Sequence, residues 1–281
     1  MKSLSARLIS ARHLAFAFCL IIITLLAAET GARWRAAGQG GNTVTVVSAA
    51  SFEPGPVAPE AIVSAFGSQL ATRVETAGAS PLPTQLAGTT VRIRDSAGVE
   101  RLAPLFFVAP QQINCLIPAN TASGAATITV TSGNGAVSTG ALRIAGVAPG
   151  LFTANANGQG VAAAVVQRRN AAGQDSFEPA AVFDLATNRF VARPIDLGPE
   201  TDQVFLLLFG TGFRFRGALS TVTARIGGTD AQVTFAGAQG VFAGLDQCNV
   251  RLLRSLAGRG DMEIVLTVDG KAANMVRVTT R

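Results

Sequence analysis

Few residues of this chain have side chains that could act as catalytic acids, bases or nucleophiles. The only histidine of its 281 residues is His13, which lies in a segment expected to be a targeting sequence, and there is no tyrosine. Beyond that segment, Lys271 is the only lysine. Without a histidine, a Ser-His-Asp triad or a Cys-His pair cannot be assembled, and nearly all zinc sites are excluded. The sequence therefore predicts a protein that is not an enzyme.

The acidic residues do not suggest a site either. Two carboxylates could act as a general acid and base, but the acidic residues are spread singly through turns. Asp95, and Asp261 with Glu263, stand in turns that lack the several oxygen ligands a calcium ion needs. We expect no metal and no cofactor, and we interpret these side chains as solvated turn carboxylates.

Two polar pairs stand at matching places in the two halves of the chain, Gln112 with Asn114 and Gln247 with Asn249. Residues two apart on a strand share one face, here the face opposite the apolar one. Their repetition indicates a structural role, such as amides that bond to a neighbouring loop backbone. A glycan contact is the alternative.

An internal repeat organises the chain. Phe66-Gly67 recurs as Phe209-Gly210, and further landmarks recur in the same order at a nearly constant spacing. These are Arg92-Ile93 with Arg225-Ile226, Ile128 to Thr131 with Ile264 to Thr267, Gly135 with Gly270, and Arg143-Ile144 with Arg277-Val278. A repeat of this length is the size of a domain. The chain is therefore two copies of one small β domain.

Short runs rich in Val, Ile, Thr and Phe alternate with Gly, Pro, Asn and Asp, as is typical of strands joined by turns. Seven short strands per copy predict an all-β chain with two tandem immunoglobulin-like β-sandwich domains, at 43–148 and 149–281. The second copy carries an insertion at 168–200, which we expect to form a long hairpin or an irregular flap.

Each repeat has one cysteine, Cys115 or Cys248. Both should point to the core side of a strand, which predicts buried free thiols. An interdomain disulfide is the alternative and would require adjacent strands with close Cα atoms.

The N-terminus has the features of an export signal. Lys2, Arg7 and Arg12 precede an uncharged apolar run at 14–28, which is short for a membrane span. We expect 1–28 to be a cleaved signal peptide or, if uncleaved, an N-terminal anchor, and 29–42 to be a flexible linker. Without those three basic residues the chain has 20 basic and 17 acidic residues, a net charge of +3. The arginines are scattered rather than clustered with aromatic residues, which excludes a nucleic-acid partner.

The residues expected to contact partners are those in which the two copies differ. They lie in the insertion and just after the second Phe-Gly pair: Arg168, Arg169, Phe177, Phe190, Arg193, Phe213, Arg214 and Arg216. Loops on a rigid scaffold often carry binding residues, and Arg and aromatic side chains are enriched at interfaces. The alternatives are a covering or disordered flap at 168–200, and a strand at 213–216 with buried Phe and exposed Arg.

Several segments resemble the Solibacter-type C-terminal domain of exported bacterial proteins. They are Val47 to Phe52, Ala65 to Gly67, Pro104 to Asn114, Ala148 to Thr153 and Phe209 to Gly212. The resemblance covers about 44–280 and implies tandem sandwiches similar to the IPT/TIG class. It implies no activity and no functional residues, and the insertion at 168–200 is longer than the hairpin common in the family.

We therefore expect an exported, non-enzymatic interaction or structural module, extracellular, periplasmic or at the cell surface. Its partner would be a protein or a glycan of the envelope or exterior, and it would meet the membrane only through 14–28 if that segment is uncleaved. The alternative is a carbohydrate-binding envelope protein.

Overall fold

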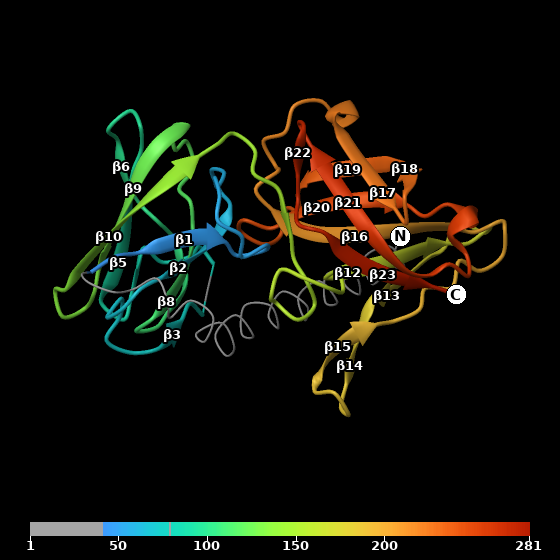
Figure 1. Cartoon of the computed structure of the whole chain (residues 1–281), viewed down its shortest axis with the longest axis horizontal. Helices are drawn as coiled ribbons and strands as arrows, with labels where there is room; N and C mark the ends of the chain where they lie inside the picture. The colour runs from blue at the N-terminus through green and yellow to red at the C-terminus, as the bar shows by residue number, and fades with distance from the viewer. Residues whose placement is uncertain (1–41, 79) are drawn as a thin grey trace, which may run out of the picture.

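The computed structural model describes residues 42–78 and 80–281. In this part of the chain almost every element is a β-strand, and the strands form two sandwiches side by side (Figure 1). The predicted all-β class with two immunoglobulin-like sandwiches is confirmed. The predicted signal or anchor at 1–28 lies outside the described residues, as does the linker up to residue 41. No helix of the described part is long and apolar enough to cross a membrane.

The first sandwich packs a sheet of order β1-β2-β8-β7-β3 against one of order β10-β9-β5-β4, with β6 on β5. The strands are β1 (Thr45–Ser48), β2 (Ile62–Phe66), β3 (Glu75–Thr76), β4 (Gln85–Leu86), β5 (Thr89–Arg94), β6 (Glu100–Leu102), β7 (Leu105–Val108), β8 (Gln112–Leu116), β9 (Gly124–Thr131) and β10 (Val137–Ile144). In β5, Val91 and Ile93 point into the core while Arg92 and Arg94 are exposed, as the alternation predicts.

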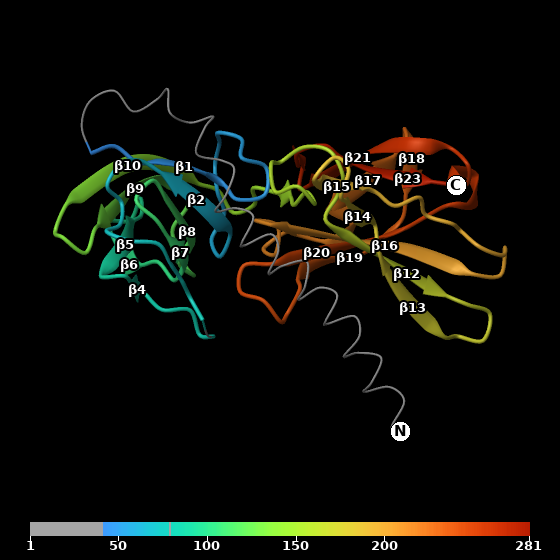
Figure 2. The same ribbon diagram turned by 90° about the horizontal axis from the view of Figure 1, so that it is seen from below.

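The second sandwich packs a sheet of order β13-β12-β16-β20-β19, with β11 on β16, against one of order β18-β17-β21-β22, with β23 on β21. Figure 2 shows the two layers from the side. The strands are β11 (Gly150–Leu151), β12 (Ala164–Arg169), β13 (Asp175–Pro179), β16 (Gln203–Thr211), β17 (Val222–Ile226), β18 (Thr229–Ala231), β19 (Val233–Ala238), β20 (Asp246–Arg251), β21 (Gly260–Val268), β22 (Lys271–Ala272) and β23 (Val276–Thr280). A separate hairpin, β14 (Ala181–Asp184) and β15 (Arg189–Ala192), projects from this sandwich (Figure 1).

Strand register shows that the sequence repeat is a structural repeat. Phe66 of β2 lies opposite Gln112 of β8, and Phe209 of β16 lies opposite Gln247 of β20. In each copy the glutamine Nε2 donates to the Oδ1 of the asparagine two residues later, at 2.9 Å in the first copy and 2.7 Å in the second. Asn114 and Asn249 therefore occupy equivalent positions, as predicted.

The surroundings of these amides differ from the prediction. Gln112 and Asn114 are buried rather than solvent-facing, because every residue of β8 is covered on both faces. Within each pair the glutamine bonds to the asparagine, and Ser64 adds a hydroxyl bond of 3.0 Å to Asn114 Oδ1. A glycan contact at Gln112 and Asn114 is thus excluded by their burial.

The two sandwiches meet in an apolar cluster that contains residues of both. Ile62 and Leu116 come from the first, and Phe209 and Leu245 come from the second. A Cβ at Gly244 would lie 2.5 Å from the side chains of Ile62 and Leu116, so only glycine permits this approach. The junction is therefore closely packed.

Thr211 provides hydrogen-bond partners for buried backbone groups at that junction. The Thr211 hydroxyl accepts the backbone N–H of Ile62 at 2.9 Å and donates to the carbonyl of Gly244 at 2.7 Å. These bonds satisfy backbone groups that would otherwise be buried without partners.

Cys115 and Cys248 are free and fully buried, which confirms the sequence prediction and contradicts the disulfide alternative. Burial raises the pKa of each thiol to about 12.

We expect neither thiol to react with a labelling reagent in the native protein. Cys115→Ala and Cys248→Ala should each lower the free energy of unfolding by about 1 kcal/mol through a small cavity. Thiol labelling followed by urea denaturation checks both, and rapid native labelling would contradict the burial.

Asp95 is not the solvated turn carboxylate that the sequence suggested. Its side chain is fully buried and accepts the backbone N–H of Ala122, Val99 and Ala97, each at 3.0 Å, and a guanidinium bond from Arg101 at 2.6 Å. These bonds, the one from Ala122 first, lower its pKa from 3.8 to about 2.

A group whose pKa is lowered by folding stabilises the folded state above its unfolded pKa and loses that effect as it becomes protonated. We therefore expect the difference in urea midpoint between the natural protein and Asp95→Asn to be largest above pH 3.8 and to shrink toward about pH 2. A difference that stays constant through this window would show that the charge of Asp95 does not matter.

Candidate interaction surface

The described residues offer little for catalysis. No group of three or more His, Cys, Asp or Glu side chains in 42–78 and 80–281 could hold a metal ion. A shallow cavity of about 330 Å³ lies beside the β17–β18 turn, but its charged side chains bind one another. Arg277 pairs with Glu263 at 2.9 Å and with Asp261 at 3.4 Å, and Arg259 donates to the carbonyl of Gly227.

The predicted contact segment 213–216 is largely internal, which corrects the sequence interpretation. Phe213 is fully buried in the core of the second sandwich. Arg214 is mostly buried and binds Asp246 at 2.8 Å, while Arg216 donates to the carbonyl of Ala236 at 2.7 Å. The segment is a turn rather than a strand, so the expected alternation does not apply, and Phe215 is the exposed residue.

Asp246 holds the turn at 213–216 against the second sandwich. Its carboxylate accepts the backbone N–H of Phe213 at 2.8 Å and of Arg214 at 3.1 Å, in addition to the guanidinium of Arg214. Burial raises the pKa of Asp246, and the charge of Arg214 opposes that rise. Glu60 of the first sandwich lies 3.7 Å from Arg214 and extends the cluster across the junction.

The first part of the 168–200 insertion is a structural extension of the sheet. Strands β12 and β13 pair from Val165 with Pro179 to Arg169 with Asp175 and are joined by a tight turn. Arg169 is exposed but bound to Asp175 at 2.9 Å. Phe177 is half-buried and packs against the junction cluster.

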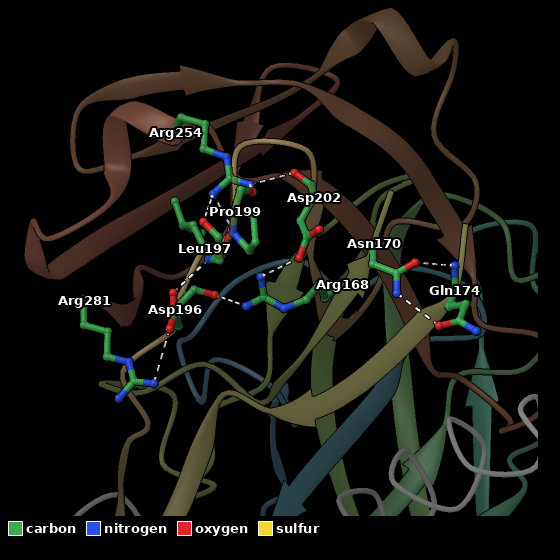
Figure 3. A network of polar contacts seen from close by, with 10 residues as sticks. Arg168, Asn170, Gln174, Asp196, Leu197, Pro199, Asp202, Arg254 and Arg281 are labelled. Carbon is green, nitrogen blue, oxygen red and sulfur yellow. Dashed lines mark hydrogen bonds and ion pairs between the residues drawn. The ribbon is translucent and has the colours of Figure 1, made fainter. Parts of the chain in front are cut away.

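Arg168 belongs to a polar network rather than to an open surface (Figure 3). It pairs with Asp202 at 3.3 Å and donates to the carbonyl of Asp196. On the opposite side of the 196–202 loop, Arg254 donates to the carbonyls of Leu197 at 2.6 Å and Asp202 at 2.8 Å (Figure 3). The two arginines thus hold the 196–202 loop, and the placement of Arg168 corrects its prediction as a contact residue.

The remaining part of the insertion, the β14–β15 hairpin, projects into solvent (Figure 1). Asn155 anchors it: its amide donates to the carbonyl of Phe190 and its oxygen accepts the N–H of Phe190, both at 2.8 Å. Ala181 is buried at the base, and Arg193 donates its N–H to the carbonyl of Ala180 at 2.9 Å. Arg193 itself is exposed and pairs with Glu178 at 3.2 Å.

The tip of the hairpin is stiffened by Asp184. Its carboxylate accepts the N–H of Ala186 at 3.0 Å and the hydroxyl of Thr187 at 2.7 Å. The Thr187 bond is the main cause of the lowered pKa of Asp184. Asn188 adopts a positive φ of 51°, which asparagine tolerates and which closes the turn.

This rigid tip presents apolar side chains to water. Leu185 is 87% exposed, Val182 47% and Phe183 43%. The ring of Phe183 meets that of Phe190 edge to face, with centroids 5.2 Å apart, and Phe190 is half-buried against the junction cluster. Of the predicted contact residues, Phe190 and Arg193 therefore lie on or beside the hairpin, whereas Phe213 and Arg214 do not.

Sequence reasoning missed Val182 and Leu185, although a signal was present. Ala181-Val182-Phe183-Asp184 and Arg189-Phe190-Val191-Ala192 mirror each other about the turn. In the structure each residue lies opposite its mirror image, so Val182 faces Val191 and Phe183 faces Phe190.

A scan against protein-family models and a search of curated proteins gave no match. The resemblance to the Solibacter-type domain therefore stays a prediction. Similar solved structures include Bacteroides ovatus SGBP-B in complex with a mixed-linkage heptasaccharide, at 11% identity, 80% coverage of this chain and a TM-score of 0.32. The chain covers 42% of the length of that protein.

Two further similar structures contain immunoglobulin domains. A tandem of titin Ig domains is 10% identical, with coverage of 86% of this chain and 96% of the other, and a TM-score of 0.23. Murine CEACAM1b is 10% identical, with coverage of 85% and 98% and a TM-score of 0.18. At these scores the comparisons carry no argument about function.

The anchoring of the hairpin can be tested by substitution. Asn155→Ala removes both bonds to Phe190, so we expect amide exchange across 181–192 to accelerate by about tenfold, the effect of losing about 1.4 kcal/mol. Asn170→Ala, at the exposed β12–β13 turn, is the matched control and should leave 181–192 unchanged. Unchanged exchange in Asn155→Ala would show that the hairpin is anchored by other contacts.

Proposed function

We propose that this chain is an exported, non-enzymatic interaction module of the bacterial envelope or exterior, and that the β14–β15 hairpin is its contact element. The observation that carries the proposal is the exposed Leu185 on a turn fixed by Asp184. Exposing a large apolar side chain on an ordered tip forgoes the stabilisation of burial. With Val182 and Phe183, Leu185 forms a group of exposed apolar side chains on one element, and such groups mark sites where a partner binds.

The export part of the proposal rests on the N-terminal sequence. The basic residues before the apolar run at 14–28, and the resemblance to the Solibacter-type domain, support passage across the inner membrane. The non-enzymatic part is supported by the near absence of histidine and lysine and by the pairing of the charged side chains in the shallow cavity.

The rigidity of the scaffold supports a binding role. A contact element that is already ordered loses little conformational entropy when its partner binds. Asn155 holds the base of the hairpin and Asp184 holds its tip. The hairpin extends from the second sandwich, which packs closely against the first. A disordered flap would have none of these contacts.

A site-specific photo-crosslinker tests the proposal in cells that export the full chain. Val182 on the hairpin and Val137 on the first sandwich expose 47% and 46% of their surface, so they are matched in access. We expect a crosslinker at 182 to form discrete adducts with a protein, with a glycan or with a second copy, and one at 137 to form none. No adducts at 182, or the same adducts at both positions, would contradict the proposal.

A further inference from the structure

The outer edge of β14 is unpaired in the described part of the chain. β14 pairs only with β15, and no isolated bridge involves it. In an antiparallel pair, opposite residues alternate between those bonded to each other and those whose N–H and C=O point outward. The alternation therefore decides which backbone groups the free edge presents.

Phe190 fixes that alternation. Both its N–H and its C=O bond to the side chain of Asn155 rather than to β14, and the bond from the N–H of Arg193 to the carbonyl of Ala180 fits the same alternation. Phe183 and Phe190 are thus a non-hydrogen-bonded pair, in agreement with the contact between their rings. It follows that the N–H and C=O of Phe183 point outward from the free edge of β14.

We propose that this edge pairs with the same edge of a second copy of the chain, antiparallel and with Phe183 opposite Phe183 of that copy. This inference rests on the proposed contact function of the hairpin. The two Phe183 residues would exchange both hydrogen bonds, and the two hairpins would become one four-stranded sheet. A two-fold axis would relate the two copies, so the contact would form a closed dimer rather than an open chain of molecules.

The side chains of the edge fit this self-pairing. The Phe183 and Phe190 rings of both copies would lie in a row across one face of the sheet, where cross-strand aromatic pairs are favourable. Val182 would lie opposite Asp184 of the second copy, so no like charges meet. The carboxylate of Asp184 is already held by its own turn and does not project across the edge.

The position of the hairpin also permits the contact. It extends below both sandwiches in Figure 1, so the bodies of two copies need not collide. Two backbone bonds and a few apolar side chains form a small interface, so the association should be weak and should depend on concentration.

Disulfide trapping tests the register. Phe183→Cys and Val182→Cys are made separately in the full chain carrying Cys19→Ala, since Cys115 and Cys248 are buried. Opposite residues of a hydrogen-bonded pair have Cα atoms about 5.5 Å apart, within the range of a disulfide, whereas two copies of residue 182 would be offset. We expect Phe183→Cys to form the linked dimer at least about tenfold faster than Val182→Cys under mild oxidation. Equal rates, or faster linkage at 182, would overturn the proposal.

A second variant tests the same edge without a cysteine. Phe183→Pro removes the ring and the outward N–H, a loss that proline tolerates on an edge strand, whereas the control Phe183→Ala removes the ring and keeps the N–H. The hairpin should persist equally in both, with the same amide exchange at β15. Relative to Phe183→Ala, self-association of Phe183→Pro measured by sedimentation should weaken by about tenfold or more, equivalent to about 1.4 kcal/mol. Association unaffected by Phe183→Pro would overturn the proposal.

The crosslinking and trapping experiments together separate the two proposals. If a crosslinker at 182 forms adducts only with other proteins or glycans, and Phe183→Cys traps no dimer, the proposed function is sustained and self-pairing is refuted.

Discussion

The structure depends on strands that are covered on both faces. All residues of β2 and β8 are buried, and β16 places Leu206 and Leu208 in one core while Phe209 packs into the junction. Because successive side chains of a strand point to opposite faces, the core of one sandwich can cover only half of them. The other half must be covered from outside, and Ile62, Leu116 and Phe209 are covered where the two sandwiches pack together at their junction.

This constraint accounts for the polar residues at the junction. Buried backbone groups need partners, and Thr211 and Asp246 supply them to Ile62, Gly244 and the turn after β16. The result is a closely packed pair of sandwiches, and the hairpin stands on the second of them. A contact element on such a support keeps its orientation relative to both sandwiches.

Much of the fold could be predicted from the sequence. Alternation gave the inward positions of Val91 and Ile93, and the repeat gave the equivalence of Asn114 and Asn249. Alternation shows which residues share a face, but it does not show whether that face is covered in the folded chain. For this reason Gln112 and Asn114 were expected in water and are buried. Phe213 was named as a contact residue, with a strand carrying buried Phe as the alternative. It is buried, but in a turn held by Asp246 that cannot be inferred from local composition.

The contact hairpin could be predicted in part. The mirrored sequence of the hairpin predicts which residues of β14 and β15 lie opposite each other. The position of the hairpin depends on its bonds to Asn155, which is distant from it in sequence. The most direct test of the central claim is a hydrogen-exchange footprint of the natural chain, comparing dilute protein with protein in contact with envelope material or at high concentration. The account predicts added protection confined to 181–192. Protection elsewhere on the two sandwiches, with none at the hairpin, would contradict it.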